Sequence, residues 1–271
     1  MAKKQQERSG SMQEKAKAMR EAQAKADRRT RNIVITVAAV LSVAVLAAVA
    51  LVILRTPSEE GGTAGLDGEL ARFENGEPIT ISSEGIMGMD PEVPDVELYF
   101  SYSCSACAVT ELSIGPDLVA GAEAGEYNLV LRPVITSEMA FTYAATGAAL
   151  AVAAEAPEQF VDFQQGLAML YYTEAQTGDV SALQDADSAA GLVADTALEL
   201  GIPSDLVDTF SAETGQQYLQ KSQALWMDSD VEGRDGFATP EIVVAGKAFE
   251  RTGDTAEEQY QAILDAVEAA K

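Results

Sequence analysis

The sequence predicts an α/β domain with a mixed β-sheet, interrupted by a helical block and preceded by one transmembrane helix. Three observations support this prediction. Short strand-like runs occur near both ends of residues 71–271, and the part between them, residues 137–230 approximately, is rich in alanine with helical spacing. An uncharged apolar run precedes the domain. The order β, β, α, β, helical block, β, β, α is typical of a sheet covered by helices.

The N-terminal part differs from the rest of the chain in charge and hydropathy. Residues 1–54 contain ten Lys/Arg and four Asp/Glu, whereas residues 55–271 contain eight and 39. Ile33–Leu54 is an uncharged run of 22 residues, and as a helix it would be about 33 Å long, enough to cross a bilayer. We therefore predict a basic segment at residues 1–31, a transmembrane anchor at 32–54 and a linker at 55–70. A cleaved signal peptide is the alternative, although the apolar run is long for one.

The distribution of charge also predicts the orientation in the membrane. Arg28, Arg29 and Arg31 flank the apolar run on its N-terminal side, and basic residues favour the cytoplasmic side. We expect a single-pass protein of the cell membrane with a cytoplasmic N-terminus and an extracytoplasmic acidic domain. Dithiols outside the cytoplasm meet an oxidising environment. The acidic domain contains no basic groove of the kind that binds nucleic acid.

The first strands of the domain are expected at residues 78–82 and Val96–Tyr102. The second of these ends just before Cys104 and Cys107, the only two cysteines of the chain. A helix should begin at the cysteines and continue to about residue 124, which places the Cys104 sulfur at its N-terminus. Unpaired backbone N–H groups and the helix dipole favour a thiolate there. The pattern predicts thiol–disulfide exchange through a redox-active Cys104–Cys107 disulfide.

Two other interpretations of the cysteines remain. They could form a purely structural disulfide, although so short a loop constrains the unfolded chain little. Alternatively, a symmetric dimer could bind zinc with four thiolates. We expect no metal and no other cofactor. The chain has no histidine, which excludes Ser-His-Asp and Cys-His catalysis and His-ligated metal sites.

The later elements follow from periodicity. Residues 127–135 are expected to form a third strand. In the Ala-rich block, apolar residues follow helical spacing and form one face that serves either core packing or partner binding. These residues are Phe160, Phe163, Leu167, Leu170 and Tyr171. A hairpin is expected at 241–245 and 248–251, with a turn at Gly246 and Lys247, before a final amphipathic helix.

Together, the segment Phe100–Cys107, the helical insertion and Thr239-Pro240 resemble the DsbA-like branch of the thioredoxin fold. The resemblance is greatest to the membrane-anchored extracytoplasmic members from Gram-positive bacteria and covers about residues 79–270. It implies a thioredoxin-like fold with a helical insertion and a cis-proline that faces the cysteines. Pro240 matches that proline, with Thr239 before it, and both are expected to bind substrate. A trans-proline at the start of a strand is the alternative.

Two positions differ from the pattern of this family. Ser105 and Ala106 replace the Pro-His that often lies between the cysteines, and this dipeptide tunes the redox potential because an imidazole stabilises the thiolate. The buried acid that the family often carries six residues before the first cysteine is replaced by Leu98. Glu97 should point to the opposite face of the strand. Water or Glu111 remains as the group that exchanges a proton with Cys107.

The resemblance implies an extracytoplasmic oxidoreductase that introduces disulfides into exported proteins. Cys104 would be the nucleophile and leaving group, and Cys107 the resolving thiol. The expected partners are unfolded or reduced exported proteins and a membrane redox partner, a quinone-linked oxidase. One alternative is a reductase or isomerase of extracytoplasmic disulfides, for example in cytochrome c maturation. The other is a non-enzymatic thioredoxin-fold chaperone or adaptor.

Overall fold

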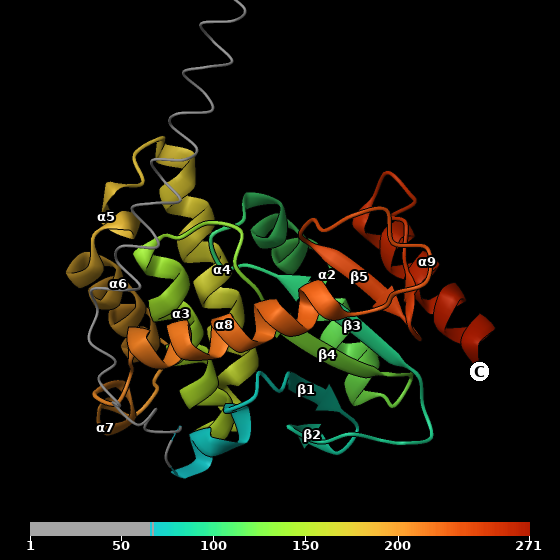
Figure 1. Ribbon diagram of the computed structural model, residues 1–271, viewed down its shortest axis with the longest axis horizontal. Helices are drawn as coiled ribbons and strands as arrows, with labels where there is room; N and C mark the ends of the chain where they lie inside the picture. The colour runs from blue at the N-terminus through green and yellow to red at the C-terminus, as the bar shows by residue number, and fades with distance from the viewer. Residues whose placement is uncertain (1–65, 67) are drawn as a thin grey trace, which may run out of the picture. The chain divides into compact units, whose positions relative to one another are not determined.

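The computed structural model describes residue 66 and residues 68–271, which fold around a mixed sheet (Figure 1). The strand order is β2-β1-β4-β3-β5-β6. β3 and β4 pair in parallel, and all other neighbouring strands pair antiparallel. The strands are β1 (Ile79–Ser82), β2 (Gly85–Ile86), β3 (Asp95–Phe100), β4 (Asn128–Pro133), β5 (Glu241–Val244) and β6 (Lys247–Ala248).

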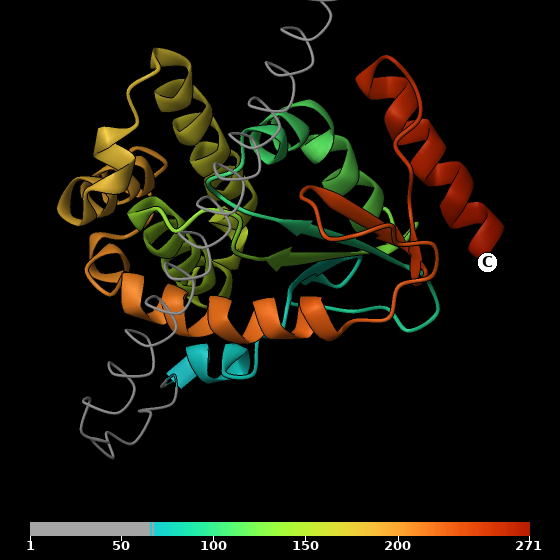
Figure 2. The same ribbon diagram turned by 45° about the horizontal axis from the view of Figure 1, so that its top comes forward.

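Most of the helices lie between β4 and β5 in the sequence, as expected for an insertion. The helices of this block are α3 (Ala140–Glu155), η2 (Pro157–Gln159), α4 (Phe160–Thr177), α5 (Ser181–Gln184), α6 (Ala186–Glu199), α7 (Ser204–Val207) and α8 (Ala212–Asp228). The helices outside it are η1 (Gly68–Phe73), α2 (Ser105–Glu123) and α9 (Ala256–Ala270). In both Figure 1 and Figure 2, α3 to α7 lie beside the sheet, whereas α8 extends across it.

The predicted cytoplasmic segment 1–31 and anchor 32–54, with most of the predicted linker 55–70, lie outside the described residues. Within residues 66 and 68–271, no helix combines the length and the apolar character needed to cross a membrane.

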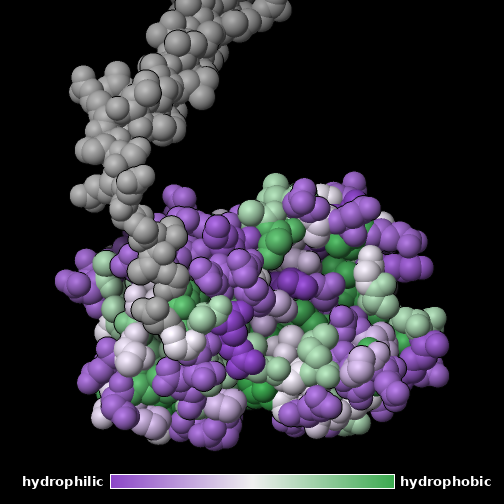
Figure 3. Space-filling view, turned by 60° about the horizontal axis from the view of Figure 1, so that its bottom comes forward, coloured by the Kyte–Doolittle hydropathy of each residue, from purple (hydrophilic) through white to green (hydrophobic). Residues whose placement is uncertain are grey.

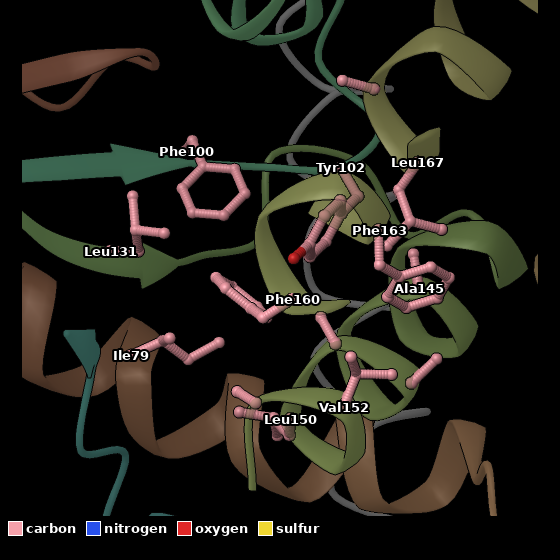
Figure 4. Packing of buried hydrophobic residues seen from close by; sticks show 14 of the residues in the cluster. Ile79, Phe100, Tyr102, Leu131, Ala145, Leu150, Val152, Phe160, Phe163 and Leu167 are labelled. Atoms are coloured by element: carbon pink, nitrogen blue, oxygen red, sulfur yellow. The ribbon is translucent and has the colours of Figure 1, made fainter. Parts of the chain in front are cut away.

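One apolar core joins the sheet to the helical insertion. Figure 4 shows Phe100 and Leu131 of the sheet close to Phe160 of α4, with α3 residues such as Val152 packed below. The apolar face predicted in the insertion lies in this core: Phe160, Phe163, Leu167 and Tyr171 are buried, and Leu170 packs against them. Core packing is therefore the correct interpretation of this face.

Two glycines permit a close approach between α3 and the start of α8. A Cβ atom at Gly147 of α3 would lie 2.0 Å from the Ser211 carbonyl oxygen, and one at Gly215 of α8 would lie 2.0 Å from the Tyr143 carbonyl oxygen. Only glycine permits the two backbones to approach so closely. This contact holds α8 against α3 before α8 continues across the sheet.

The sheet differs from the prediction at both edges. β2 was not expected and pairs with β1 through Ile81–Ile86 and Ser82–Gly85. The predicted turn at Gly246 and Lys247 was wrong, because Val244 pairs with Lys247 and leaves Ala245 and Gly246 in the turn. Both turn residues have positive φ, 48° and 81°, as two-residue hairpin turns require. β6 is correspondingly shorter than predicted and ends at Ala248.

Candidate active site

Cys104 is the N-cap residue of α2, as the sequence predicted. Its backbone is extended, and its sulfur accepts a hydrogen bond from the Cys107 backbone N–H at 3.2 Å. β3 ends at Phe100, and the turn that follows is closed by a hydrogen bond from Cys104 N to the Ser101 carbonyl oxygen. The half-buried Cys104 sulfur therefore lies where the first N–H groups of the helix converge.

The two thiols have opposite environments. Hydrogen bonding from the Cys107 thiol, helped by the Thr239 hydroxyl and by backbone N–H groups, outweighs partial burial and lowers the pKa of Cys104 to about 6. The same hydrogen bond to Cys104, together with burial, raises the pKa of Cys107 far above that of an ordinary thiol. Cys107 is only 5% exposed. At neutral pH the pair therefore carries one thiolate, on Cys104, the thiol that solvent reaches.

Thr239 and Pro240 lie directly opposite Cys104, although Thr239 is 135 residues further along the chain. The peptide bond between them is cis, as expected. The Thr239 hydroxyl donates to the Cys104 sulfur at 3.4 Å, and the Thr239 carbonyl oxygen lies 3.6 Å from the same sulfur. The pairing of β5 with β3 brings these residues to the cysteines, because Glu241 lies opposite Tyr99.

Glu111 is buried one helical turn beyond Cys107, on the same face of α2. It is 8% exposed, and burial raises the pKa of its carboxyl to about 7, although a hydrogen bond from Gln164 acts in the opposite direction. Cys107 and Glu111 line one small cavity, which has a water-accessible volume of about 10 Å³. That is about the space that one water molecule needs. A Cβ atom at Gly115 would lie 2.7 Å from a Glu111 carboxylate oxygen, so this glycine makes room for the carboxylate.

The strand before the cysteines places its residues as predicted. Leu98 is buried and lines a second small cavity together with Glu111. Glu97 forms an ion pair with Arg132, and both neighbours of Glu97 in the strand, Val96 and Leu98, belong to the main core. The carboxylate beside the cysteines is therefore that of Glu111 in the helix.

Ser105 and Ala106 are exposed at the start of α2, where a substrate can contact them. Sequence reasoning missed two polar links between the cysteine turn and the insertion. The Ser103 hydroxyl contacts the Thr142 hydroxyl of α3, and the Tyr102 hydroxyl donates to Gln164 Oε1 of α4 at 2.6 Å. Gln164 interrupts an otherwise apolar helix face, which is a sequence signal for such a link. No comparable signal identifies Thr142.

Comparisons with known proteins agree with this geometry. Residues 86–266 match the family described as "Thioredoxin". The match covers more than half of the sequence, and the chain belongs to this thioredoxin family. No curated protein matches the sequence.

The fold is shared with solved structures, including two that are described as thiol–disulfide oxidoreductases. The MdbA protein, a thiol-disulfide oxidoreductase from Actinomyces oris, has a TM-score of 0.58 and 18% identity, covering 79% of this chain and 99% of that one. BdbD from Bacillus subtilis, in its oxidised form, has a TM-score of 0.51 and 21% identity, covering 72% and 92%. The MdbA protein from Corynebacterium matruchotii has a TM-score of 0.51 and 18% identity, covering 69% and 85%. The expected thioredoxin-like fold, with its helical insertion and its C-x-x-C arrangement at the start of α2, is confirmed.

Proposed function

We propose that this protein is an extracytoplasmic thiol–disulfide oxidoreductase that introduces disulfides into exported proteins. The observation that carries the proposal is the difference between the two sulfurs at the N-terminus of α2. Cys104 is reachable and its thiolate is stabilised, whereas Cys107 is buried and protonated. A nucleophile and a resolving thiol need these two environments.

The reaction transfers two electrons from the substrate to the protein. A substrate thiolate attacks the Cys104 sulfur of the Cys104–Cys107 disulfide, the bond between the two cysteines breaks, and Cys107 leaves and takes up a proton. A second substrate thiolate then attacks the substrate sulfur of the mixed disulfide and releases Cys104 as a thiolate. The substrate gains one disulfide, and the protein keeps two reduced cysteines.

Glu111 is the group placed to exchange the proton of Cys107. The two side chains line one cavity with room for a water molecule, and a carboxyl with a pKa of about 7 both gives and takes a proton near neutral pH. Thr239 is placed to orient the substrate, because its backbone lies beside the Cys104 sulfur and an extended peptide can pair with such a backbone.

The low pKa of Cys104 favours the oxidising direction over a reductase. A stabilised thiolate is a good leaving group and stabilises the reduced protein, which makes the disulfide a stronger oxidant. The reduced protein then needs an electron acceptor, for which we propose a quinone-linked oxidase of the membrane. The predicted anchor at residues 32–54 and the acidic domain beyond it support a position outside the cytoplasm.

The test is the redox equilibrium of the full-length protein, purified in detergent, with glutathione. We expect a potential well above that of thioredoxin, about −270 mV, and rapid oxidation of a reduced, unfolded substrate protein. The Cys104→Ser variant should not oxidise the substrate, whereas Cys107→Ser should accumulate mixed disulfides. A potential near or below that of thioredoxin would favour a reductase. Absence of exchange in the wild-type protein would leave a chaperone or adaptor.

A further inference from the structure

A buried ion pair anchors the segment 229–240, which joins α8 to β5 and ends at Thr239 and Pro240. Arg234 in this segment and Glu241 at the start of β5 have side chains that are only 7% and 10% exposed. Arg234 Nε donates to Glu241 Oε1 at 2.7 Å, and Arg234 Nη2 donates to Glu241 Oε2 at 3.0 Å. This is the planar two-bond arrangement that an arginine forms with a carboxylate.

The remaining polar atoms of the pair fix both ends of the segment. Arg234 Nη1 donates to the carbonyl oxygen and the hydroxyl of Ser229, at 2.9 and 2.8 Å, where the segment begins. The indole N–H of Trp226 in α8 donates to Glu241 Oε2 at 2.7 Å, where the segment ends. One guanidinium group therefore connects the C-terminus of α8, the middle of the segment and the first residue of β5.

Aromatic side chains surround the guanidinium and leave it little freedom to move. Its central carbon lies 4.7 Å from the Phe237 ring centre and 5.8 Å from that of Tyr99 in β3. The Phe237 ring packs edge-on against Trp226. Such contacts hold a planar cation in one orientation.

The energetics of a buried pair indicate a role in geometry rather than in stability. Removing two charges from water costs about as much as their attraction returns, so an apolar pair of similar size would stabilise the fold equally well. What the ion pair supplies is a fixed path for the backbone. Only Pro240 separates Glu241 from Thr239, whose contacts to the Cys104 sulfur are 3.4 and 3.6 Å long. A shift of the segment by about 1 Å would break contacts of that length.

We propose that Arg234 is a positioning residue, which holds Thr239 against the Cys104 sulfur through its ion pair with Glu241. Its contribution to substrate turnover rests on the function proposed above, but its effect on Cys104 does not. The hydrogen bond from Thr239 is one of the interactions that lower the pKa of Cys104. Loss of the anchor should therefore be measurable at the sulfur itself.

The protein contains a matched control for this pair. Arg132 of β4 forms an ion pair with Glu97 of β3, and its guanidinium also lies over the Tyr99 ring, at 5.7 Å. No hydrogen bond connects Arg132 to the segment 229–240 within the described residues. Arg132→Gln therefore removes a similar ion pair from the same sheet without loosening Thr239.

The experiment measures the rate at which Cys104 reacts with iodoacetamide as a function of pH, in the reduced full-length protein, with the modified cysteine identified by mass spectrometry. In Arg234→Gln we expect the apparent pKa of Cys104 to rise by about 0.5 to 1 unit, because one hydrogen bond to the thiolate is loosened. Arg132→Gln should keep the wild-type profile. An unchanged profile in a folded Arg234→Gln variant, or an equal shift in Arg132→Gln, would overturn the proposal.

If the Arg234→Gln variant does not fold, the same alkylation measurement on the Arg234→Lys variant tests the proposal. Lysine keeps the charge but cannot form two parallel hydrogen bonds to Glu241 and reach Ser229 as well. A raised apparent pKa of Cys104 in this variant supports the proposal, and a wild-type profile overturns it. Alkylation does not require catalysis, so failure of the wild-type protein to oxidise substrates would refute the proposed function and leave this test intact.

Discussion

Cys104 and Cys107 differ in reactivity because they lie three residues apart at the start of α2. Cys104 precedes the first turn of α2, and its sulfur accepts a hydrogen bond from the Cys107 backbone N–H. Cys107 lies inside that turn and is buried in the core. The C-x-x-C spacing after a strand was enough to predict this difference, because it depends only on local geometry.

Glu111 provides a test of the buried site by a single substitution. Burial raises its pKa to about 7, so between pH 4.3 and 7 the folded state binds more protons than the unfolded state, and stability falls as pH rises. Above pH 7, the destabilisation caused by the buried Glu111 charge no longer changes with pH. Glu111→Gln keeps the shape without the charge and should stabilise the protein at pH 8 by about 3–4 kcal/mol, with little effect at pH 4.

Denaturant unfolding of the full-length protein between pH 4 and 8 measures this difference. Glu123→Gln, at an exposed position of the same helix, is the control and should change stability little at any pH. The Glu111→Gln variant should also form the mixed disulfide with substrate more slowly, because Cys107 loses the group that protonates it as it leaves. An equal effect of Glu111→Gln at pH 4 and pH 8 would show that Glu111 does not change its charge in that range.

The long-range parts of the site show where sequence reasoning ends. The positions of Thr239 and Pro240 followed from a family resemblance, whereas the hydrogen bond from the Thr239 hydroxyl depends on how β5 pairs with β3. Arg234 was not predicted at all. Its loop has no periodicity, and its partner Glu241 is one of 39 acidic residues after residue 54, so the sequence contains no signal that selects it.

At the level of elements, the insertion supports the active site as well as the core. Helix α3 contacts the turn before Cys104 through Thr142 and Ser103, and α4 contacts it through Gln164 and Tyr102. The helical character of the insertion was predictable from alanine content and spacing. Its contact with the cysteine turn was not, because helix packing against a distant loop leaves no periodic pattern in the sequence.

Thr142→Val tests the contribution of this contact. Thr142 is fully buried, and its hydroxyl contacts Ser103 and donates to the Ser137 carbonyl oxygen. Valine has nearly the same shape but leaves these groups without a partner, which should destabilise the protein by about 1–3 kcal/mol. Thr196→Val is the control, because the Thr196 hydroxyl bonds only to the Leu192 carbonyl oxygen one turn earlier in its own helix. Thermal unfolding measures the midpoint of both variants. An equal decrease in the two midpoints would show that the contact of α3 with the cysteine turn adds nothing to stability beyond an ordinary bond within a helix.

The edges of the sheet were the least predictable elements. β2 has two residues and β6 has two, too few for a pattern with a period of two to be recognised. β6 is set instead by its neighbours, since Ala248 N donates to the Glu232 carbonyl oxygen in the loop after α8. The central strands β3, β4 and β5 are mostly buried, and they were predicted within two residues at each end because clusters of apolar residues mark them in the sequence.

For the whole molecule, the separation of charge between the two parts of the chain is the main property that the fold does not explain. The described domain contains most of the acidic residues, and Figure 3 shows hydrophilic residues over most of the face in view, with hydrophobic ones in the recesses between them. Such a surface favours solubility. Ten of the 18 basic residues precede the apolar run, where they would favour a cytoplasmic N-terminus if that run is the predicted anchor.

Protease treatment of intact cells tests that orientation. If the chain spans the membrane once with its basic end inside, added protease or a membrane-impermeant label should reach residues 55–271 and spare residues 1–31. Permeabilised cells, in which both parts become accessible, are the control. Reversing the charge asymmetry, by replacing Arg28, Arg29 and Arg31 with glutamate, should increase the fraction of molecules in the opposite orientation. Labelling of residues 1–31 alone in intact cells would place Cys104 and Cys107 in the reducing cytoplasm, and the proposed role in oxidising exported proteins would then have to be abandoned.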